Sequence, residues 1–401
     1  MSESPPTVLA RVAGLWTPRR AAFWLAIAAF FAWLPLLVMP ASQWADFGSF
    51  WTAGKLAFTP QVVGLQPVLA YESAHRLPPT PFLYPPWFAL VYVPFTWLPF
   101  DVAGALHVLL QLAALIGAAL LGGRLYGLPR RWAVLGALAW SPAAAGVLSG
   151  QNSALLLLLV VIAAGGVTSG RWAVAGIALG LGLYRPQLGL PVVALAAWRG
   201  VWRAVAVALV VLLVEYLLGV VASGGMLDWP LKWLAAIGSE TGTDFAAVGW
   251  QAISLPGLLG RISFDGSAQG ALLGPALVGY LLGGIVIVVA LPALRAWDAP
   301  RAVALACALA LLVDPRGWSY DGTLLLPVLA ILARDAKAKG WRDADRWLLA
   351  AAFAIALTWR LGIYVGVNPE ALLVLAAPVI LLDWARLAGP RGGPRQPQTS
   401  G

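Results

Sequence analysis

An isolated carboxylate follows the first long apolar run of the chain. Asp46 lies in the stretch WADFGSFWTAG, residues 44–54, among Trp44, Phe47, Phe50 and Trp51. An apolar setting near the edge of a bilayer can tune a carboxylate toward general-base work. We therefore take Asp46 as the candidate catalytic base.

Two arginines supply the complementary charge. Arg185 lies in LYRPQLG and Arg316 in DPRGWSYDG. A guanidinium is permanently charged and presents its N–H groups as a fork that matches phosphate oxygens, so both are candidates to bind a phosphate. Polar and aromatic side chains in these and similar motifs are candidates for binding the rest of a substrate. They are Lys55, Tyr84, Gln151, Asn152, Gln187, Trp318, Tyr320 and Asp321.

Each of these motifs also has a purely structural explanation. Asn152 could cap a helix, Arg185 could extend its charge to the membrane surface, and DPRG could be a simple turn. Taken singly, the structural explanation is favoured. Their convergence on one face of the protein favours a site.

Composition determines which elements must position these residues. Of the 401 residues, 61% are hydrophobic and 11% are charged, whereas soluble domains carry about 25% charged residues. Long apolar runs recur throughout the chain and lack the alternation of a transmembrane barrel. The sequence predicts an all-α polytopic membrane protein. The net charge of +9 comes from basic residues scattered between the runs, which indicates membrane topology rather than nucleic-acid binding.

About 12 spans are predicted, some of them short or broken, with interfacial helices in the first and fourth outer loops (41–101 and 223–269). The spans are 20–40, 102–122, 132–148, 152–169, 172–184, 188–198, 203–222, 270–293, 301–314, 321–334, 347–364 and 370–386. With the N-terminus inside, 19 Lys and Arg residues lie on the inner side and 7 on the outer side. Both termini are therefore predicted to be cytoplasmic. Residues 1–390 form one predicted domain, and 391–401 a disordered cytoplasmic tail.

Two segments do not fit simple spans. Segment 84–100 is short and carries four prolines; we interpret it as a re-entrant or interfacial helix on the outer side, with a proline-kinked span as the alternative. Segment 172–198 is too short for two full crossings. Two short helices meeting at LYRPQLG would solve this and place Arg185 within the protein.

Metal chemistry has little support. His75, His107 and Cys307 stand alone, without ligand spacing. The sequence predicts no metal and no other cofactor.

The motifs, read in order, resemble a known family. DFGSFWTAGKLAF, AYE, FLYPPWFALVYVPFTWLP, GQNSALLLLLVVIA, YRPQLGLPVVALAA and DPRGWSYDGTLLLP resemble the bacterial polyprenyl-phosphate-mannose-dependent α-mannosyltransferases of the type C superfamily of integral-membrane glycosyltransferases. The resemblance covers the chain from about residue 46 to 327.

This resemblance implies a reaction. Asp46 matches the catalytic aspartate of the first outer loop, which deprotonates an acceptor hydroxyl for inverting attack on a sugar linked to polyprenyl phosphate. Arg185 matches a Lys/Arg-Pro-Gln position and would stabilise the leaving phosphate. Many members carry a histidine where this chain has Tyr320.

The resemblance also implies partners and a location. The partners are a polyprenyl-phosphate-linked sugar, which the resemblance implies is mannose, a lipid or glycan acceptor and the bilayer, but no nucleic acid. The location is the bacterial inner membrane, with the active site on the outer face. A transporter or lipid-linked-sugar flippase is the main alternative, although such proteins usually show internal repeats. A non-enzymatic scaffold would leave Asp46 and Arg185 without a reason to be buried.

Overall fold

The computed structural model describes residues 17–38, 45–262 and 274–387, and these ranges are built from helices. No strand occurs within them, and one isolated bridge pairs Ala252 with Trp318. The predicted tail 391–401 and Trp44 lie outside the described residues.

The helices of the first half are α2 Pro18–Val38, α3 Ala45–Leu56, α4 Leu65–Ala74, α5 Pro86–Tyr92, α6 Phe100–Leu125, α7 Arg130–Ala139, α8 Ser141–Ser149, α9 Ser153–Thr168, α10 Trp172–Leu181 and α11 Pro186–Trp198. Those of the second half are α12 Trp202–Ala222, α13 Trp229–Val248, α14 Leu255–Ile262, α16 Pro275–Ala296, α17 Ala299–Leu312, α18 Leu326–Lys339, α19 Asp343–Leu357, α20 Gly362–Val365 and α21 Ala371–Leu387.

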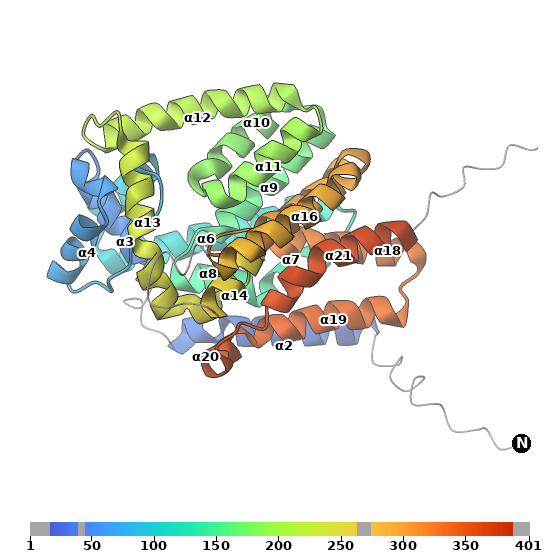
Figure 1. The fold of residues 1–401 in the computed structure, drawn as a ribbon. Coiled ribbons are helices and arrows are strands. Elements are labelled where there is room, and N and C mark those ends of the chain that lie inside the picture. The colour runs from blue at the N-terminus through green and yellow to red at the C-terminus, as the bar shows by residue number, and fades with distance from the viewer. Residues whose placement is uncertain (1–16, 39–44, 263–273, 388–401) are drawn as a thin grey trace, which may run out of the picture.

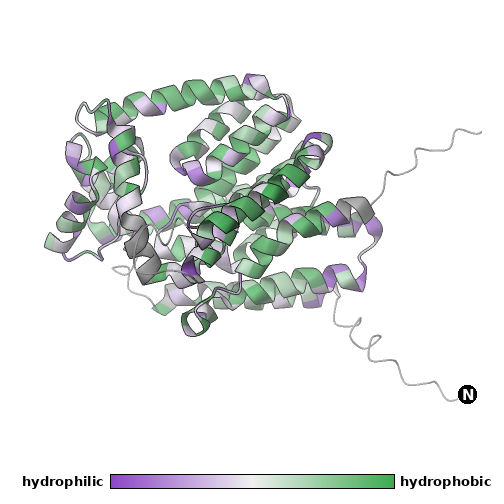
Figure 2. Ribbon diagram, viewed as in Figure 1, coloured by the Kyte–Doolittle hydropathy of each residue, from purple (hydrophilic) through white to green (hydrophobic). Residues whose placement is uncertain are grey.

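Several helices suit a lipid environment. Among the described residues, α6, α12 and α16 are long and apolar enough to cross a membrane, and two bent pairs, α7 with α8 and α19 with its continuation to Val365, raise the number to 5. These helices are apolar along most of their length (Figure 2), and α12 exposes side chains such as Leu209 and Val210. The chain is a multi-pass helical membrane protein. The total of about 12 spans stays a prediction.

Both irregular segments are resolved. Segment 84–100 forms α5, of 7 residues, and the 3₁₀ turn Val93–Trp97. A helix of this length rises about 10 Å, less than the about 30 Å of hydrocarbon, which favours the re-entrant or interfacial interpretation over a proline-kinked span. Segment 172–198 forms α10, the 3₁₀ turn Gly182–Tyr184 and α11, so the predicted break is confirmed.

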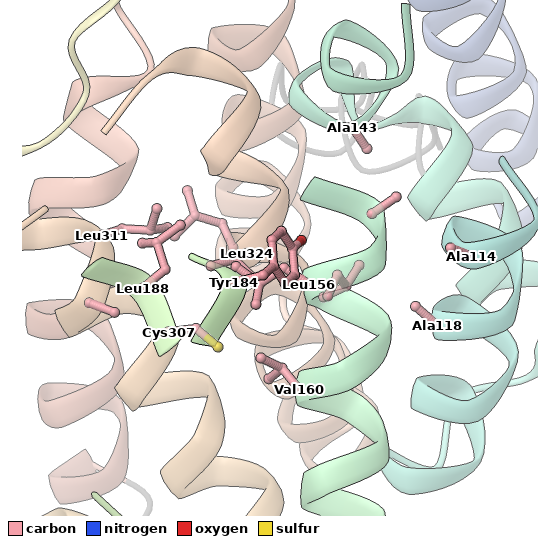
Figure 3. Packing of buried hydrophobic residues seen from close by; sticks show 14 of the residues in the cluster. Ala114, Ala118, Ala143, Leu156, Val160, Tyr184, Leu188, Cys307, Leu311 and Leu324 are labelled. Carbon is pink, nitrogen blue, oxygen red and sulfur yellow. The ribbon is translucent and has the colours of Figure 1, made fainter. Parts of the chain in front are cut away.

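The core is centred on α17. Every residue of this helix from Ala304 to Leu312 is buried. Figure 3 shows Cys307 and Leu311 of α17 facing side chains from α9, α11 and the turn that carries Tyr184. Because α17 is enclosed by other helices, it provides a fixed surface against which the broken pair α10 and α11 is positioned.

The two ends of the helix bundle differ. At one end, cationic side chains donate to turns that lie far away in the chain: Arg199 donates to the carbonyl of Trp297 at 2.8 Å, and Lys337 donates to that of Gly127 at 3.3 Å. Helices α3, α4 and α13 lie toward the opposite end (Figure 1). We call the end that contains Arg199 and Lys337 the cationic end. Its assignment to the cytoplasmic side stays a prediction.

Candidate active site

Arg185 lies at the break between α10 and α11. A residue before proline is disfavoured in the helical region, and Arg185 has φ −119° and ψ 79°. Pro186 then starts α11, where its missing N–H has no cost. Gly189 allows the close approach of the two segments, because a Cβ there would lie 2.6 Å from the carbonyl oxygen of Gly182. The Arg185 side chain is thereby turned inward and is 4% exposed.

The guanidinium of Arg185 connects four segments of the chain. It forms an ion pair with Asp321. It also donates to Ser153 Oγ at 3.0 Å, to Gln151 Oε1 at 3.3 Å and to the Tyr84 hydroxyl at 3.3 Å. Four of the five N–H donors of an arginine are then occupied. We call these five residues the Arg185 cluster.

Two aromatic rings flank the same guanidinium. Its central carbon lies 5.7 Å from the centroid of the Tyr84 ring and 5.3 Å from that of Tyr320. These distances permit cation–π attraction to both rings. The sequence suggested that the Arg185 guanidinium is open to a phosphate. In the structure, one N–H of Arg185 is left for a ligand, and a second would be released only if Asp321 moved away.

Asp46 occupies the first turn of α3 and is half-buried. The N-terminal end of a helix favours a negative charge. Phe47 and Phe50 are fully buried in an aromatic cluster with Tyr92 and anchor α3. They fix the helix that presents Asp46, and the expectation that they also surround its carboxylate stays a prediction.

Asp46 interacts electrostatically with the two tyrosines that flank Arg185. Burial raises the pKa of the Tyr84 hydroxyl to about 12, Arg185 opposes this shift, and the negative charges of Asp321 and Asp46 add to it. Asp46 also acts electrostatically on Tyr320. The structure therefore gathers Asp46, Tyr84, Gln151, Arg185, Tyr320 and Asp321, all of which the sequence suggested as site residues.

The turn between α8 and α9 explains why Gln151 lies beside α3. Gly150 has φ +82°, and a Cβ there would lie 2.8 Å from the backbone nitrogen of Phe47. Only a glycine fits this left-handed position so close to another backbone. The following residue, Gln151, accepts a hydrogen bond from Tyr84 at 2.7 Å.

The DPRGWSYDG segment positions Asp321 through its own backbone. One carboxylate oxygen of Asp321 accepts from the Trp318 N–H at 3.1 Å, while the other pairs with Arg185. The segment is attached to the predicted fourth outer loop, since the Ile253 N–H donates to the carbonyl of Gly317 at 2.8 Å. Trp318 itself is buried beside Ala252.

Four of the sequence-suggested residues are not members of the Arg185 cluster. Lys55 is exposed and donates to the Thr96 carbonyl at 2.8 Å; nine residues along a helix place it on the face opposite Asp46. Gln187 is exposed on α11. Arg316 is half-buried and acts on Tyr280 of α16, and Asn152 is fully buried beside Tyr92.

Sequence reasoning missed a carboxylate behind the site. Glu370 is 1% exposed and accepts a hydrogen bond from the Ser319 hydroxyl at 2.6 Å. The Asn368 side chain, in the same turn, donates to the carbonyl of Gln251 at 3.3 Å. The sequence signal was a lone acidic residue between two apolar runs. The hydrogen bond from Ser319 to Glu370 holds the start of the turn that carries Asp321.

We expect Glu370→Ala to destabilise the protein, because it leaves the buried Ser319 hydroxyl without its acceptor, a loss of about 1–3 kcal/mol. It should also lower turnover, since the Asp321 turn is released. Glu370→Gln keeps an acceptor oxygen and serves as the control. Thermal unfolding in detergent and sugar-transfer assays on both variants test this. Equal behaviour of the alanine and glutamine variants would contradict the positioning role.

A second buried carboxylate, Glu72 of α4, lies behind α3. It is 0% exposed and accepts from the Thr80 N–H at 2.8 Å. Burial raises the pKa of Glu72 to about 8, against which the Thr80 bond acts. The folded protein therefore keeps a proton that the unfolded chain releases above about pH 4.5, so this group makes stability fall as pH rises toward 8.

Glu72→Gln should remove this pH dependence, because the amide oxygen still accepts from Thr80 but does not ionise. The melting temperature of the wild type is expected to fall between pH 6 and pH 9 relative to that of the variant. The difference between the two curves isolates Glu72, since the other titrating groups are shared. Parallel curves would show that Glu72 keeps an ordinary pKa.

The described residues contain no group of three or more His, Cys, Asp or Glu side chains arranged to hold a metal ion. The chain does carry one Asp-x-Asp pattern, a spacing often seen at metal sites, at Asp343 and Asp345. These carboxylates pair with Arg346 at 3.0 Å and Arg342 at 3.1 Å at the start of α19. They belong to the cationic end and not to the Arg185 cluster.

One comparison with known proteins identifies a family. The model of glycosyltransferase family 87 matches residues 82–315, more than half of the chain. This range includes Tyr84, Gln151 and Arg185, whereas Asp46 and Asp321 lie outside it. No curated protein and no solved structure matches the chain significantly.

Proposed function

The chain belongs to glycosyltransferase family 87, and we propose that it transfers mannose from a polyprenyl-phosphate-linked donor to a hydroxyl of a lipid or glycan acceptor. Family membership makes it a membrane glycosyltransferase of the type C superfamily, which uses a sugar donor and an acceptor. The likeness of its motifs to polyprenyl-phosphate-mannose-dependent enzymes supports mannose. The outer face of a bacterial inner membrane is the proposed location.

The observation that carries the proposal is a buried cation and a half-buried carboxylate that act on the same two tyrosines. A charged side chain is costly within a membrane protein and usually serves a cavity, a partner or a substrate. Arg185 is paired with Asp321, yet one N–H remains, and Asp46 acts on the same tyrosines. A cation and a separate carboxylate are what phosphate departure and hydroxyl activation require.

The donor class follows from the location and the chemistry. The outer face of an inner membrane has no supply of nucleotide sugars, whereas a lipid-linked sugar can be delivered through the bilayer. A polyprenyl chain would remain in the hydrocarbon while its phosphate reaches the polar cluster. We place the polar cluster at the break between α10 and α11 at this depth.

In the proposed reaction, Asp46 accepts the proton of the acceptor hydroxyl. The freed oxygen attacks the anomeric carbon of the sugar, and the bond from this carbon to the phosphate oxygen breaks. Polyprenyl phosphate leaves with the electron pair, and the configuration at the anomeric carbon inverts. Arg185 stabilises the growing negative charge on the phosphate through its remaining N–H, and Gln151 and the two tyrosines hold the guanidinium in place.

A donor panel tests this function. The purified chain is incubated with an acceptor lipid extract and with radiolabelled mannose carried by polyprenyl phosphate or by a nucleotide. Glucose on polyprenyl phosphate serves as the test of the sugar. We expect transfer from polyprenyl-phosphate mannose alone. Transfer from the nucleotide sugar would overturn the proposed donor, and equal use of glucose would overturn the proposed sugar.

A further inference from the structure

A basic groove of about 490 Å³ lies at the cationic end, between the end of α6 and the last turns of α18. Its lining includes Arg124, Tyr126, Gly127, Arg334 and Lys337, and its size is that of a small-molecule site. We propose that this groove binds the phosphate-bearing headgroup of an anionic phospholipid.

The groove is separate from the candidate active site. Helix α6 begins at Phe100, whose ring lies 5.5 Å from that of Phe47, the neighbour of Asp46. It ends at Leu125, at the groove, after 26 residues. Such a helix is about 39 Å long, slightly more than the hydrocarbon thickness of about 30 Å. The groove therefore lies at the membrane face opposite Asp46.

Two carboxylates near the groove are already neutralised. Arg334 pairs with Asp298 at 3.1 Å and with Asp335 at 3.3 Å, and Arg301 forms a further ion pair with Asp335. These two arginines balance the two carboxylates. Any other cation in the groove is a net positive charge.

Arg124 and Lys337 provide that net charge. Arg124 is exposed and makes no ion pair with the residues that the structure describes. Lys337 makes one hydrogen bond, to the carbonyl of Gly127 at 3.3 Å, which leaves two of its three donors for a ligand. Basic pockets between membrane helices favour anionic headgroups, and each nearby Lys or Arg contributes about 1 kcal/mol.

The surface beside the groove favours a lipid over free phosphate. Leu120 and Leu121 are 37% and 39% exposed and lie one helical turn before Arg124, on the same side of α6. Farther along the helix, Leu109 and Leu110 are also exposed. A headgroup held by Arg124 would have its acyl chains along these leucines, whereas inorganic phosphate would gain nothing from them.

The test measures the melting temperature of the full chain in detergent micelles that contain increasing amounts of short-chain phosphatidylglycerol. Phosphatidylcholine and inorganic phosphate are the comparison ligands. The groove variant is Arg124→Gln/Lys337→Gln. The matched control is Arg130→Gln/Arg131→Gln, which removes two exposed charges from the same end of the bundle but outside the groove lining.

We expect phosphatidylglycerol to stabilise the wild type and the control variant equally, and the groove variant to bind it at least about tenfold more weakly. Unchanged affinity in the groove variant would overturn the proposal. Equal stabilisation by phosphatidylcholine, or full stabilisation by inorganic phosphate, would overturn the assignment to an anionic lipid. If the double variant does not fold, Arg124→Gln alone gives the same comparison, because this side chain is exposed.

Discussion

Replacing Asp46 by asparagine is expected to reduce kcat for sugar transfer by about 100-fold to 10,000-fold, the usual contribution of a general base. The amide has nearly the shape of the carboxylate but cannot accept the proton of the acceptor hydroxyl. Asp46 is half-buried in the first turn of α3, while Phe47 and Phe50 anchor the helix. The substitution should therefore leave the fold intact.

Steady-state assays with saturating donor and acceptor measure this effect, and the melting temperature of the variant checks its folding. Lys55→Gln is the matched control, since it changes an exposed residue on the opposite face of the same helix. We expect the control to retain most of the activity. Undiminished turnover in a folded Asp46→Asn variant would remove Asp46 from the role of base.

Removing either partner of the Arg185–Asp321 ion pair is expected to destabilise the protein by about 3–5 kcal/mol, because the remaining charge is buried without compensation. Both side chains are at most 5% exposed. Loss of activity in Arg185→Ala alone would therefore be ambiguous between failure to fold and failure to use the donor.

The double variant Arg185→Gln/Asp321→Asn resolves this ambiguity. It removes both charges while retaining polar atoms for Tyr84, Gln151 and Ser153, so we expect it to recover much of the stability lost in each single variant. Its kcat/KM for the lipid-linked donor should stay about 100-fold to 1,000-fold below that of the wild type, since the cation is gone. A stable double variant with normal donor use would contradict the phosphate role of Arg185.

Local rules predicted the break at Arg185. Proline restricts the residue before it and can begin a helix, so LYRPQLG indicated two short helices, which the structure contains. The same kind of reasoning could have separated Lys55 from Asp46, because nine residues along a helix turn a side chain to the opposite face. The expectation placed WADFGSFWTAG in the first outer loop, 41–101, without a helix assigned to it, whereas the structure begins α3 at Ala45.

Long-range pairings were beyond sequence reasoning. Asp321 was suggested as a substrate ligand, but it lies 136 residues from Arg185 in the chain and neutralises its charge. Glu370 lies 51 residues from Ser319, from which it accepts a hydrogen bond. No periodicity or local preference connects such positions, because the contacts arise only when α9, α11 and the Asp321 turn pack around α17.

The most direct test of the central claim follows both halves of the donor. Polyprenyl-phosphate mannose is labelled with one isotope in the sugar and another in the lipid, and is presented with acceptor to the purified protein in liposomes. The account predicts that sugar label moves to the acceptor and an equal amount of lipid label is recovered as polyprenyl phosphate, with neither change in Asp46→Asn. If the two labels cross the membrane still joined, the protein moves the lipid-linked sugar instead of transferring it, and the account is wrong.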